Sequence, residues 1–307
     1  MTVALLVLLV RVVDLRETWS ILASASPALV LLGISLSVCD RALMFGKWFP
    51  LLRARVPEAP LFPALRVYLA SGLAQYLLPV TVGADMLRAT AVGRSRNAVA
   101  EVGASIVVER LLGTLAAGVM CIVAFAIAVR EDLPVRFLIP WAAASVVIGA
   151  LALVLPFTRL GVGLMRRAAE GLPEGGWVRF LRRLTQGYVA YRNRPALLVW
   201  VGLLSLVEQC FPLAIMGIVG VALGSPLSLS ALFVTMPLTL FVSRLPVSIA
   251  GIGVGEAAIV YLLGLFSVPT ADALAIALLC RAIDLPIMTL PGIALWRELV
   301  HAPEPAA

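Results

Sequence analysis

The sequence predicts an all-α, polytopic membrane protein built from two inverted repeats. Hydrophobic residues make up 62% of the chain and charged residues 13%, and the mean hydropathy is +1.04. Soluble domains carry about 25% charged residues, and several apolar runs here exceed the roughly 20 residues that span a bilayer. Two similar breaks, at residues 78–85 and 245–251, interrupt apolar segments in the two halves. We therefore expect about six full spans, two re-entrant or broken helical hairpins and a basic cytoplasmic helical loop.

The full spans follow from apolar runs that end at charged residues or breakers. The first run is short and lacks a basic segment before it, so we expect a truncated or tilted span rather than a cleaved signal. A Lys47-Trp48 pair marks the interfacial end of the second span, and a loop follows at 49–60. The expected spans are 1–13, 27–48, 98–129, 137–156, 196–222 and 271–296.

Each hairpin consists of two apolar segments that flank a break. Residues 61–79 and 84–93 form the first, and residues 229–245 and 254–267 form the second. A helix interrupted at membrane depth exposes backbone groups that lipid cannot satisfy, so breaks occur inside protein or beside a water-filled cavity. Paired breaks in two halves are typical of a transporter's central binding site. The first segment has 19 residues, about 28 Å at helical rise, so a complete crossing stays an alternative.

Basic residues set the expected orientation. Eight arginines lie between Arg159 and Arg194, against Glu170 and Glu174. Membrane-length apolar runs flank this stretch, which disfavours a nucleic-acid surface. The positive-inside rule instead indicates a cytoplasmic loop at 157–195.

The two hairpins then enter the membrane from opposite faces. Basic loops flank 61–93, which places both of its ends inside, whereas neutral turns flank 229–267, which places both of its ends outside. This antisymmetry is shared by inverted-repeat transporters. The expected location is the plasma (inner) membrane, with the C-terminus in the cytoplasm. We expect one transmembrane domain at 1–297, with repeat one at about 27–129, repeat two at about 196–296 and a short tail at 298–307.

The residue inventory argues against catalysis, metals and cofactors. His301 is the single histidine, and the four cysteines lie at scattered spacings in apolar segments. The glycine-rich run at 251–256 lacks the third glycine and the βαβ context of a dinucleotide-binding loop. No nucleophile–base set is evident. We expect a protein that is not an enzyme, holds no metal or cofactor, and takes any energy from an ion or lipid gradient.

The breaks carry residues that we expect to bind a substrate. A helix that restarts after a break exposes unpaired N–H groups and about half a positive charge at its N-terminus. Two such ends near mid-membrane make an anion site. The expected hinge and binding residues are Pro79 and Gly83 in the first half, and Pro246, Gly251 and Gly253 in the second.

Asp85 and Glu256 follow the two breaks, and we expect both in the first turn of a restarted helix. There a carboxylate can cap the helix and neutralise its dipole, or couple transport to a proton or cation. The Asp40-Arg41 and Glu208-Gln209 pairs also lie within spans, and we rank them below the break residues.

Arginines at membrane depth indicate a functional site more strongly than these carboxylates do. Each costs from about 2.5 to over 10 kcal/mol and indicates a function with a specific partner. Arg281 and Asp284 lie three residues apart and can pair, whereas the adjacent Glu109 and Arg110 point in different directions and each need a partner elsewhere. The arginines either form a buried ion network or bind a phosphate with their forked donors, and the two roles are compatible. The four arginines are Arg88, Arg110, Arg244 and Arg281.

These motifs resemble the transmembrane region of lysylphosphatidylglycerol synthases, a family of flippase-like integral membrane proteins. The matching stretches are Pro79 with Gly83-Ala84-Asp85-Met86-Leu87-Arg88, then Val107-Val108-Glu109-Arg110-Leu111-Leu112-Gly113, Leu245-Pro246 through Gly253 to Glu256, and Arg281. Asp85 follows Ala84 rather than a glycine, which departs from the family's pattern. The resemblance implies a lipid-translocating module, which in bifunctional relatives moves aminoacylated phosphatidylglycerol. We expect no lysyl transfer, because the sequence lacks the soluble aminoacyltransferase domain.

The leading hypothesis is a lipid flippase that binds an anionic, phosphate-containing headgroup near mid-membrane. Its expected partners are membrane lipids, either an anionic phospholipid or an isoprenoid-phosphate-linked lipid, and not nucleic acid. One alternative is a small-anion transporter built on the same site. Another is a membrane scaffold or accessory subunit for a lipid- or glycan-modifying transferase. Assembly with a second copy or with a transferase is compatible with each hypothesis.

Overall fold

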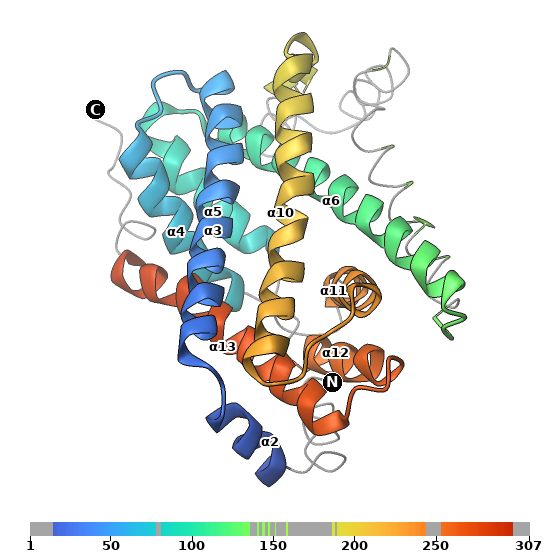
Figure 1. The fold of residues 1–307 in the computed structure, drawn as a ribbon. Coiled ribbons are helices and arrows are strands. Elements are labelled where there is room, and N and C mark those ends of the chain that lie inside the picture. Colours follow the sequence, from blue (N-terminus) through green and yellow to red (C-terminus); the bar gives the residue numbers. More distant parts are fainter. Residues whose placement is uncertain are drawn as a thin grey trace. The chain divides into compact units, whose positions relative to one another are not determined.

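The computed structural model describes residues 15–77, 81–135, 189–243 and 253–296, with isolated positions between 140 and 187. All secondary structure in these ranges is helical (Figure 1), which confirms the predicted all-α class. The elements are α2 (Leu15–Ala23), α3 (Pro27–Arg55), α4 (Leu61–Leu77), α5 (Thr81–Gly93), the 3₁₀ turn η1 (Arg94–Arg96), α6 (Val99–Arg130), the 3₁₀ turn η4 (Ala190–Asn193), α10 (Pro195–Ala222), α11 (Leu229–Ser243), α12 (Val254–Gly264) and α13 (Thr270–Ala294).

Four long helices, α3, α6, α10 and α13, coincide with four of the predicted spans. They contain 25 to 32 residues and are apolar enough to cross a membrane. At 1.5 Å per residue they are about 38 to 48 Å long, against a hydrocarbon core of about 30 Å. The protein is thus a multi-pass membrane protein. The predicted spans at 1–13 and 137–156 and most of the basic loop lie outside the described residues.

The surfaces of these helices suit contact with lipid. Large apolar side chains remain exposed on α3 and α10, including Leu31, Val38, Val199, Leu203 and Val207. Exposed aliphatic side chains at so many positions of one helix are unusual for a protein in water. Acyl chains solvate such side chains without cost, so the exposure agrees with the membrane assignment.

The helix α3 is longer than predicted. We expected its span to end at Lys47-Trp48 and a loop to begin at residue 49, but the helix continues through Pro50 to Arg55. An internal proline costs a helix about 3 kcal/mol. Here Trp48 and Leu51 are fully buried, and this packing offsets the cost.

Lys47 and Trp48 lie in the protein interior, so the prediction of an interfacial pair was wrong. Lys47 is 2% exposed, and its Nζ donates to Ser205 Oγ at 3.3 Å. The Trp48 Nε1–H group donates to Ser105 Oγ at 3.1 Å. The two polar groups are therefore satisfied by α10 and α6 rather than by interfacial water.

Two helical hairpins occur where the breaks predicted them. The chain leaves α4 at Leu77 and starts α5 at Thr81, and these two helices pack against each other. It leaves α11 at Ser243 and starts α12 at Val254, and these two also pack together (Figure 1). At 11 to 17 residues, each helix is about 16 to 26 Å long, less than the hydrocarbon thickness. The side from which each hairpin enters stays a prediction.

The helix boundaries differ from the predicted ones at two places. The helix α5 begins at Thr81 rather than near Ala84, so Gly83 lies inside it. The helix α12 ends at Gly264 rather than at residue 267, and Ser267, with φ 61°, lies in the turn that leads to α13.

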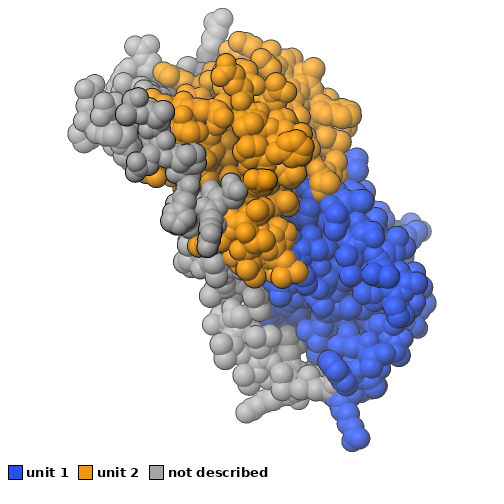
Figure 2. Space-filling view, turned by 90° about the vertical axis from the view of Figure 1, so that its left-hand side faces the viewer, with its two compact units in different colours: residues 1–41, 117–143, 207–287 blue, residues 42–116, 144–206, 288–307 orange. Residues whose placement is uncertain are grey.

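The chain forms two compact units, coloured separately in Figure 2. Unit 1 comprises residues 1–41, 117–143 and 207–287, and unit 2 comprises residues 42–116, 144–206 and 288–307. The hairpin of α11 and α12 belongs to unit 1, and the hairpin of α4 and α5 belongs to unit 2. Each long helix contributes residues to both units.

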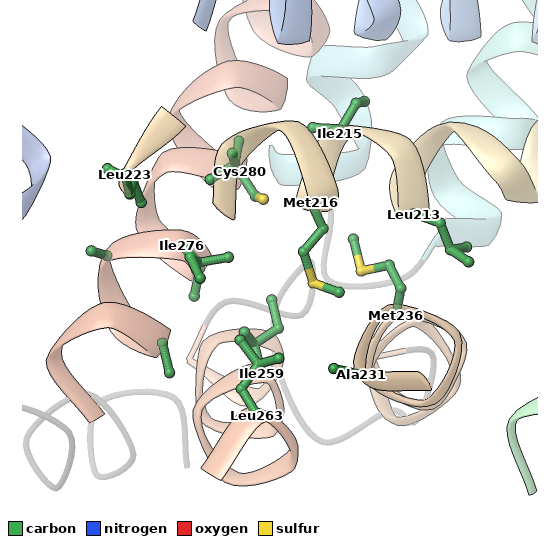
Figure 3. Close-up of a cluster of buried hydrophobic side chains, with 14 of the residues drawn as sticks. Leu213, Ile215, Met216, Leu223, Ala231, Met236, Ile259, Leu263, Ile276 and Cys280 are labelled. Atoms are coloured by element: carbon green, nitrogen blue, oxygen red, sulfur yellow. The ribbon is translucent and has the colours of Figure 1, made fainter. Parts of the chain in front are cut away.

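The core of unit 1 is aliphatic and sulfur-rich. Side chains from α10, α11, α12 and α13 converge in it, and Met216 and Met236 face one another beside Ile259 and Leu263 (Figure 3). Methionine fills irregular gaps because its side chain is unbranched and polarizable. This core holds the second hairpin against α10 and α13.

The core of unit 2 is aromatic. Trp48 stacks on Tyr68 with ring centroids 5.7 Å apart, and Phe45 meets the edge of Tyr68 at 5.5 Å. Such pairs contribute about 0.5–1.5 kcal/mol beyond their area burial. They join α3 to α4 and so position the first hairpin.

Close backbone packing in unit 2 generates a stability prediction. A Cβ at Gly72 would lie 2.6 Å from the Met288 carbonyl oxygen, whereas a Cβ at Gly46 would meet nothing within 4 Å. We expect Gly72→Ala to lower the free energy of unfolding by about 1–3 kcal/mol through overpacking. Gly46→Ala should leave it unchanged or raise it by up to about 1 kcal/mol. Unfolding of the detergent-solubilised protein measures both, and equal stabilities would contradict the contact.

Candidate functional site

The first ion-pair cluster lies in unit 2, between the helix that follows the first break and the next long helix. It consists of Asp85 and Arg88 on α5, and Glu109 and Arg110 on α6. Arg88 Nη2 donates to Glu109 Oε2 at 2.8 Å. Arg110 donates to both Asp85 oxygens, from Nε at 3.1 Å and Nη2 at 3.0 Å. The structure thus supplies the separate partners that the adjacent Glu109 and Arg110 required.

Arg88 occupies an aromatic cage. Arg88 as a whole is 4% exposed. Its guanidinium carbon lies 4.6 Å from the centroid of the Trp48 ring and 5.3 Å from that of the Tyr68 ring. Cation–π contacts of a desolvated guanidinium contribute about 2 kcal/mol or more. Arg88 Nε has no hydrogen-bond partner among the described residues. The cage therefore holds a charged group with one donor unused.

Arg110 differs from Arg88 in its exposure. Its side chain is 44% exposed and that of Asp85 is 21% exposed, whereas those of Arg88 and Glu109 are 5% and 6% exposed. The Arg110–Asp85 pair is bidentate, the geometry in which a guanidinium binds carboxylate or phosphate. Asp85 also lies 3.8 Å from Arg88 Nη2. Asp85 is thus placed between two guanidinium groups, of which one is accessible.

The second ion-pair cluster lies in unit 1 and follows the second break. It consists of Gly253, Glu256 and Arg281. The Gly253 backbone N–H donates to Glu256 Oε2 at 2.7 Å, and Arg281 Nε donates to Glu256 Oε1 at 2.7 Å. Gly253 has φ 83°, a conformation that favours glycine. Glu256 therefore caps α12, as predicted, and binds an arginine at the same time.

Gly255 makes room for this cluster. A Cβ at this position would lie 3.3 Å from Arg281 Nη2 and 3.3 Å from Ser243 Oγ. The guanidinium and the last residue of α11 thus approach the backbone of α12. A Cβ here would fit only if Arg281 or Ser243 shifted slightly.

The two clusters have the same arrangement of residues along the chain. Asp85 and Arg110 are separated by 25 residues, and so are Glu256 and Arg281. In each, a carboxylate on the helix after the break binds an arginine on the next long helix. The internal repeat itself stays a prediction. That the two breaks meet at mid-membrane stays a prediction, because the clusters belong to different units.

Several predicted site residues take other places than expected. Asp85 is not in the first turn of α5, so it does not cap the restarted helix, because that helix begins four residues earlier. Asp284 accepts a hydrogen bond from Ser37 Oγ at 2.5 Å, and Arg281 binds Glu256. Residues outside the described ranges are Pro79, Arg244, Pro246 and Gly251.

The sequence did not reveal the aromatic cage. Trp48 and Tyr68 lie 40 and 20 residues before Arg88, and each reads as an ordinary interfacial or packing residue. Their helical neighbourhood offered no signal, because the cage depends on how α3 and α4 pack against α5. Within the described ranges, no group of three or more His, Cys, Asp or Glu side chains is placed to hold a metal ion.

Comparison with known protein families identifies the chain. The profile of the Lysylphosphatidylglycerol synthase TM region matches residues 1–292, nearly the whole sequence. The chain belongs to the lysylphosphatidylglycerol synthase TM region family. No curated protein matches it. The family places this protein in a group of flippase-like membrane proteins and confirms the resemblance drawn from the motifs at both breaks.

The chemistry open to this family member follows from its two clusters. Each presents a guanidinium that is already oriented by a carboxylate, at 44% exposure for Arg110 and 28% for Arg281. Guanidinium groups bind phosphate and carboxylate in the same forked geometry. In each cluster this geometry is occupied by the protein's own carboxylate, Asp85 or Glu256.

A double-mutant cycle tests the buried pair of the first cluster. We expect Arg88→Met or Glu109→Leu alone to lower the free energy of unfolding by about 3–5 kcal/mol, because each leaves an unpaired buried charge. The double variant should recover most of the loss, since an apolar pair needs no counter-charge. Unfolding in detergent measures all four proteins. Strictly additive losses would show that the two side chains do not act as a pair.

Proposed function

We propose that this protein is a lipid flippase that binds the phosphate-containing headgroup of an anionic lipid at its ion-pair clusters. The observation that carries the proposal is the Arg110–Asp85 pair. Arg110 is half-exposed and holds a carboxylate with two parallel hydrogen bonds. A phosphodiester presents two oxygens to the same donors. The preferred substrates are an anionic phospholipid or an isoprenoid-phosphate-linked lipid.

In the proposed binding step, a headgroup phosphate displaces Asp85 from Arg110. Asp85 then stays within reach of Arg88, from which it is 3.8 Å away in the unbound state. The unused Arg88 Nε offers a further donor. Glu109 remains bound to Arg88, so Arg88 then faces two carboxylates, and the bound headgroup gives the cluster one excess negative charge.

The second cluster plays the equivalent part in the other repeat. Glu256 is held by both the Gly253 N–H and Arg281, so its release also uncaps α12. A ligand at Arg281 would thereby loosen the start of that helix. In an inverted-repeat transporter such local changes accompany alternation between two access states.

An apolar pocket between α10 and α11 in unit 1 is compatible with a lipid substrate. A cavity of about 400 Å³ in unit 1 has an almost wholly apolar lining. In the proposed mechanism, acyl chains remain in the bilayer or enter such apolar grooves while only the headgroup crosses. The lining residues include Cys210, Leu213, Gly217, Leu229 and Phe233.

The proposal includes a location and a role without catalysis. We place the protein in the plasma (inner) membrane, with the basic loop at 157–195 and the C-terminus in the cytoplasm, on the charge pattern of the sequence. Binding and release of a headgroup need no covalent step, so the protein is proposed not to be an enzyme. A transferase or a second copy of the chain is a compatible partner.

Reconstitution into vesicles tests the function. Vesicles would contain fluorescently labelled phosphatidylglycerol, with labelled phosphatidylcholine as the zwitterionic control lipid. We expect Arg110→Ala and Arg281→Ala to slow phosphatidylglycerol flipping about tenfold or more, since a charged hydrogen bond contributes about 1.5–3 kcal/mol. Arg110→Lys keeps the charge but loses the fork and should fall between. Arg130→Ala, at the exposed end of α6, is the control variant and should flip the lipid as fast as wild type.

The same vesicles distinguish the other functions. Equal flipping by wild type, Arg110→Ala and Arg281→Ala would remove the proposal. Uptake of radiolabelled phosphate without lipid flipping would identify a small-anion transporter. Loss of folding or of partner binding in the two variants, with no lipid or phosphate movement by wild type, would identify a scaffold.

A further inference from the structure

A group of arginines lies in unit 2 outside the first ion-pair cluster, at the ends of three long helices. They belong to the last turn of α3, to the turn η1 before α6 and to the turn η4 before α10. Within the described ranges, none of their guanidinium groups forms an ion pair with a carboxylate. The carboxyl groups of the same segments are Glu58 and Glu101, against six arginines: Arg53, Arg55, Arg94, Arg96, Arg192 and Arg194. Such an excess of positive charge attracts an anionic partner.

Direct contacts hold these segments together. The Tyr191 hydroxyl on η4 donates to the Leu51 carbonyl oxygen on α3 at 2.7 Å. A Cβ added to Gly187, shortly before η4, would lie 3.0 Å from Ala104 Cβ on α6 and 3.9 Å from Arg55 Nε. Figure 1 shows α3 ending and α10 beginning at the same end of this unit. The end of α3 and the turn η4 are therefore neighbours.

Two of the arginines flank Tyr191. This residue is 1% exposed, and the positive charges of Arg55 and Arg194 both act on its hydroxyl group. Arg194 is exposed, whereas Arg55 is partly buried. Arg55 Nε is buried and has no hydrogen-bond partner in the part of the chain that the structure describes. Arg55 thus keeps a donor available next to a second, accessible guanidinium group.

Glu101, in the first turn of α6, is the obvious internal partner for Arg55. Its Oε2 atom is also buried without a hydrogen-bond partner among the described residues. If the two side chains bound one another through these atoms, neither atom would be left over. Arg55 therefore does not use this carboxylate oxygen, and an external anion can take its Nε–H group.

The length of the helices places these arginines at the level of the lipid headgroups. The helices α3 and α10 contain 29 and 28 residues, about 44 and 42 Å at helical rise. A bilayer with its headgroup regions is about 40–45 Å thick, so helices of this length end among the headgroups. Trp200, near the start of α10, is 56% exposed, and tryptophan is enriched at this interface.

We propose that Arg55 and Arg194 bind the phosphate of an anionic phospholipid that stays in the leaflet at this end of unit 2. Arg55 donates from the protein side through its unused Nε–H group, and Arg194 donates from the exposed side. Forked guanidinium groups suit phosphate oxygens, and basic pockets at the ends of membrane helices bind the headgroups of anionic lipids. This lipid is a resident ligand rather than a transported one, so the inference does not rest on the proposed function.

Native mass spectrometry of the full-length protein in detergent, titrated with phosphatidylglycerol, tests the site. Wild type should bind phosphatidylglycerol more tightly than phosphatidylcholine, which carries no net charge. Arg55→Ala and Arg194→Ala should each weaken phosphatidylglycerol binding about fivefold, which corresponds to about 1 kcal/mol per basic residue. Arg55→Lys should fall between, since lysine keeps the charge but loses the fork. Arg130→Ala, at the other end of α6, is the control and should bind as wild type does.

A second background separates this lipid from a transported one. The variant Arg110→Ala/Arg281→Ala lacks both guanidinium groups of the proposed headgroup sites, and it should still bind phosphatidylglycerol in a manner that Arg194→Ala weakens. Loss of all phosphatidylglycerol binding in this background would assign the lipid to the ion-pair clusters and overturn the inference, while the proposed function would stand. Retained binding by a protein that flips no lipid would support the inference and remove the proposed function.

Two further results would contradict the site. Unchanged phosphatidylglycerol affinity in Arg55→Ala and Arg194→Ala would show that these arginines only orient the chain in the membrane. Equal affinity for phosphatidylglycerol and phosphatidylcholine would exclude recognition of an anionic headgroup. If Arg55→Ala does not fold, Arg194→Ala decides alone, because Arg194 is exposed and its side chain makes no packing contact in the core clusters of unit 2.

Discussion

A charge that is buried away from water must find its counter-charge within the protein, and Arg88 imposes this constraint on unit 2. Its side chain is 5% exposed and binds Glu109, which is equally buried. The pair joins α5 to α6, and the rings of Trp48 and Tyr68 cover the guanidinium. The contacts of Arg88 thus link four helices: α3, α4, α5 and α6. Because lipid offers no replacement for any of these contacts, the first hairpin has few other ways to pack.

The two ion-pair clusters follow one plan but differ in how firmly they hold their carboxylates. Both oxygens of Asp85 bind Arg110, an exposed partner, and the side chain plays no part in capping its helix. Glu256 divides its oxygens between Arg281 and the Gly253 backbone. Displacement of Asp85 therefore costs one ion pair, whereas displacement of Glu256 also costs a helix cap. In the proposed function, this difference makes the first cluster the easier place for a headgroup to bind.

The sequence predicted a helix well wherever a run of apolar residues or a helix-breaking residue marks it. The spans around α6, α10 and α13 and both hairpins lie within a few residues of their predicted bounds. The errors came where packing opposed a local signal. Pro50 and the basic residues after it indicated a loop, yet burial of Trp48 and Leu51 keeps α3 helical to Arg55. The same extension turned Lys47 from an expected interfacial residue into an interior one.

By itself the sequence determined that the protein is helical, crosses a membrane several times, breaks two helices and carries arginines that need partners. These properties depend on the free energy of transferring side chains and backbone groups from water to lipid. That free energy can be judged for each segment separately, without knowing its neighbours in the fold. Only the tertiary structure decided which carboxylate binds which arginine and that aromatic rings enclose Arg88. Such contacts join residues 20 to nearly 250 positions apart, and side chains so distant meet only when helices pack.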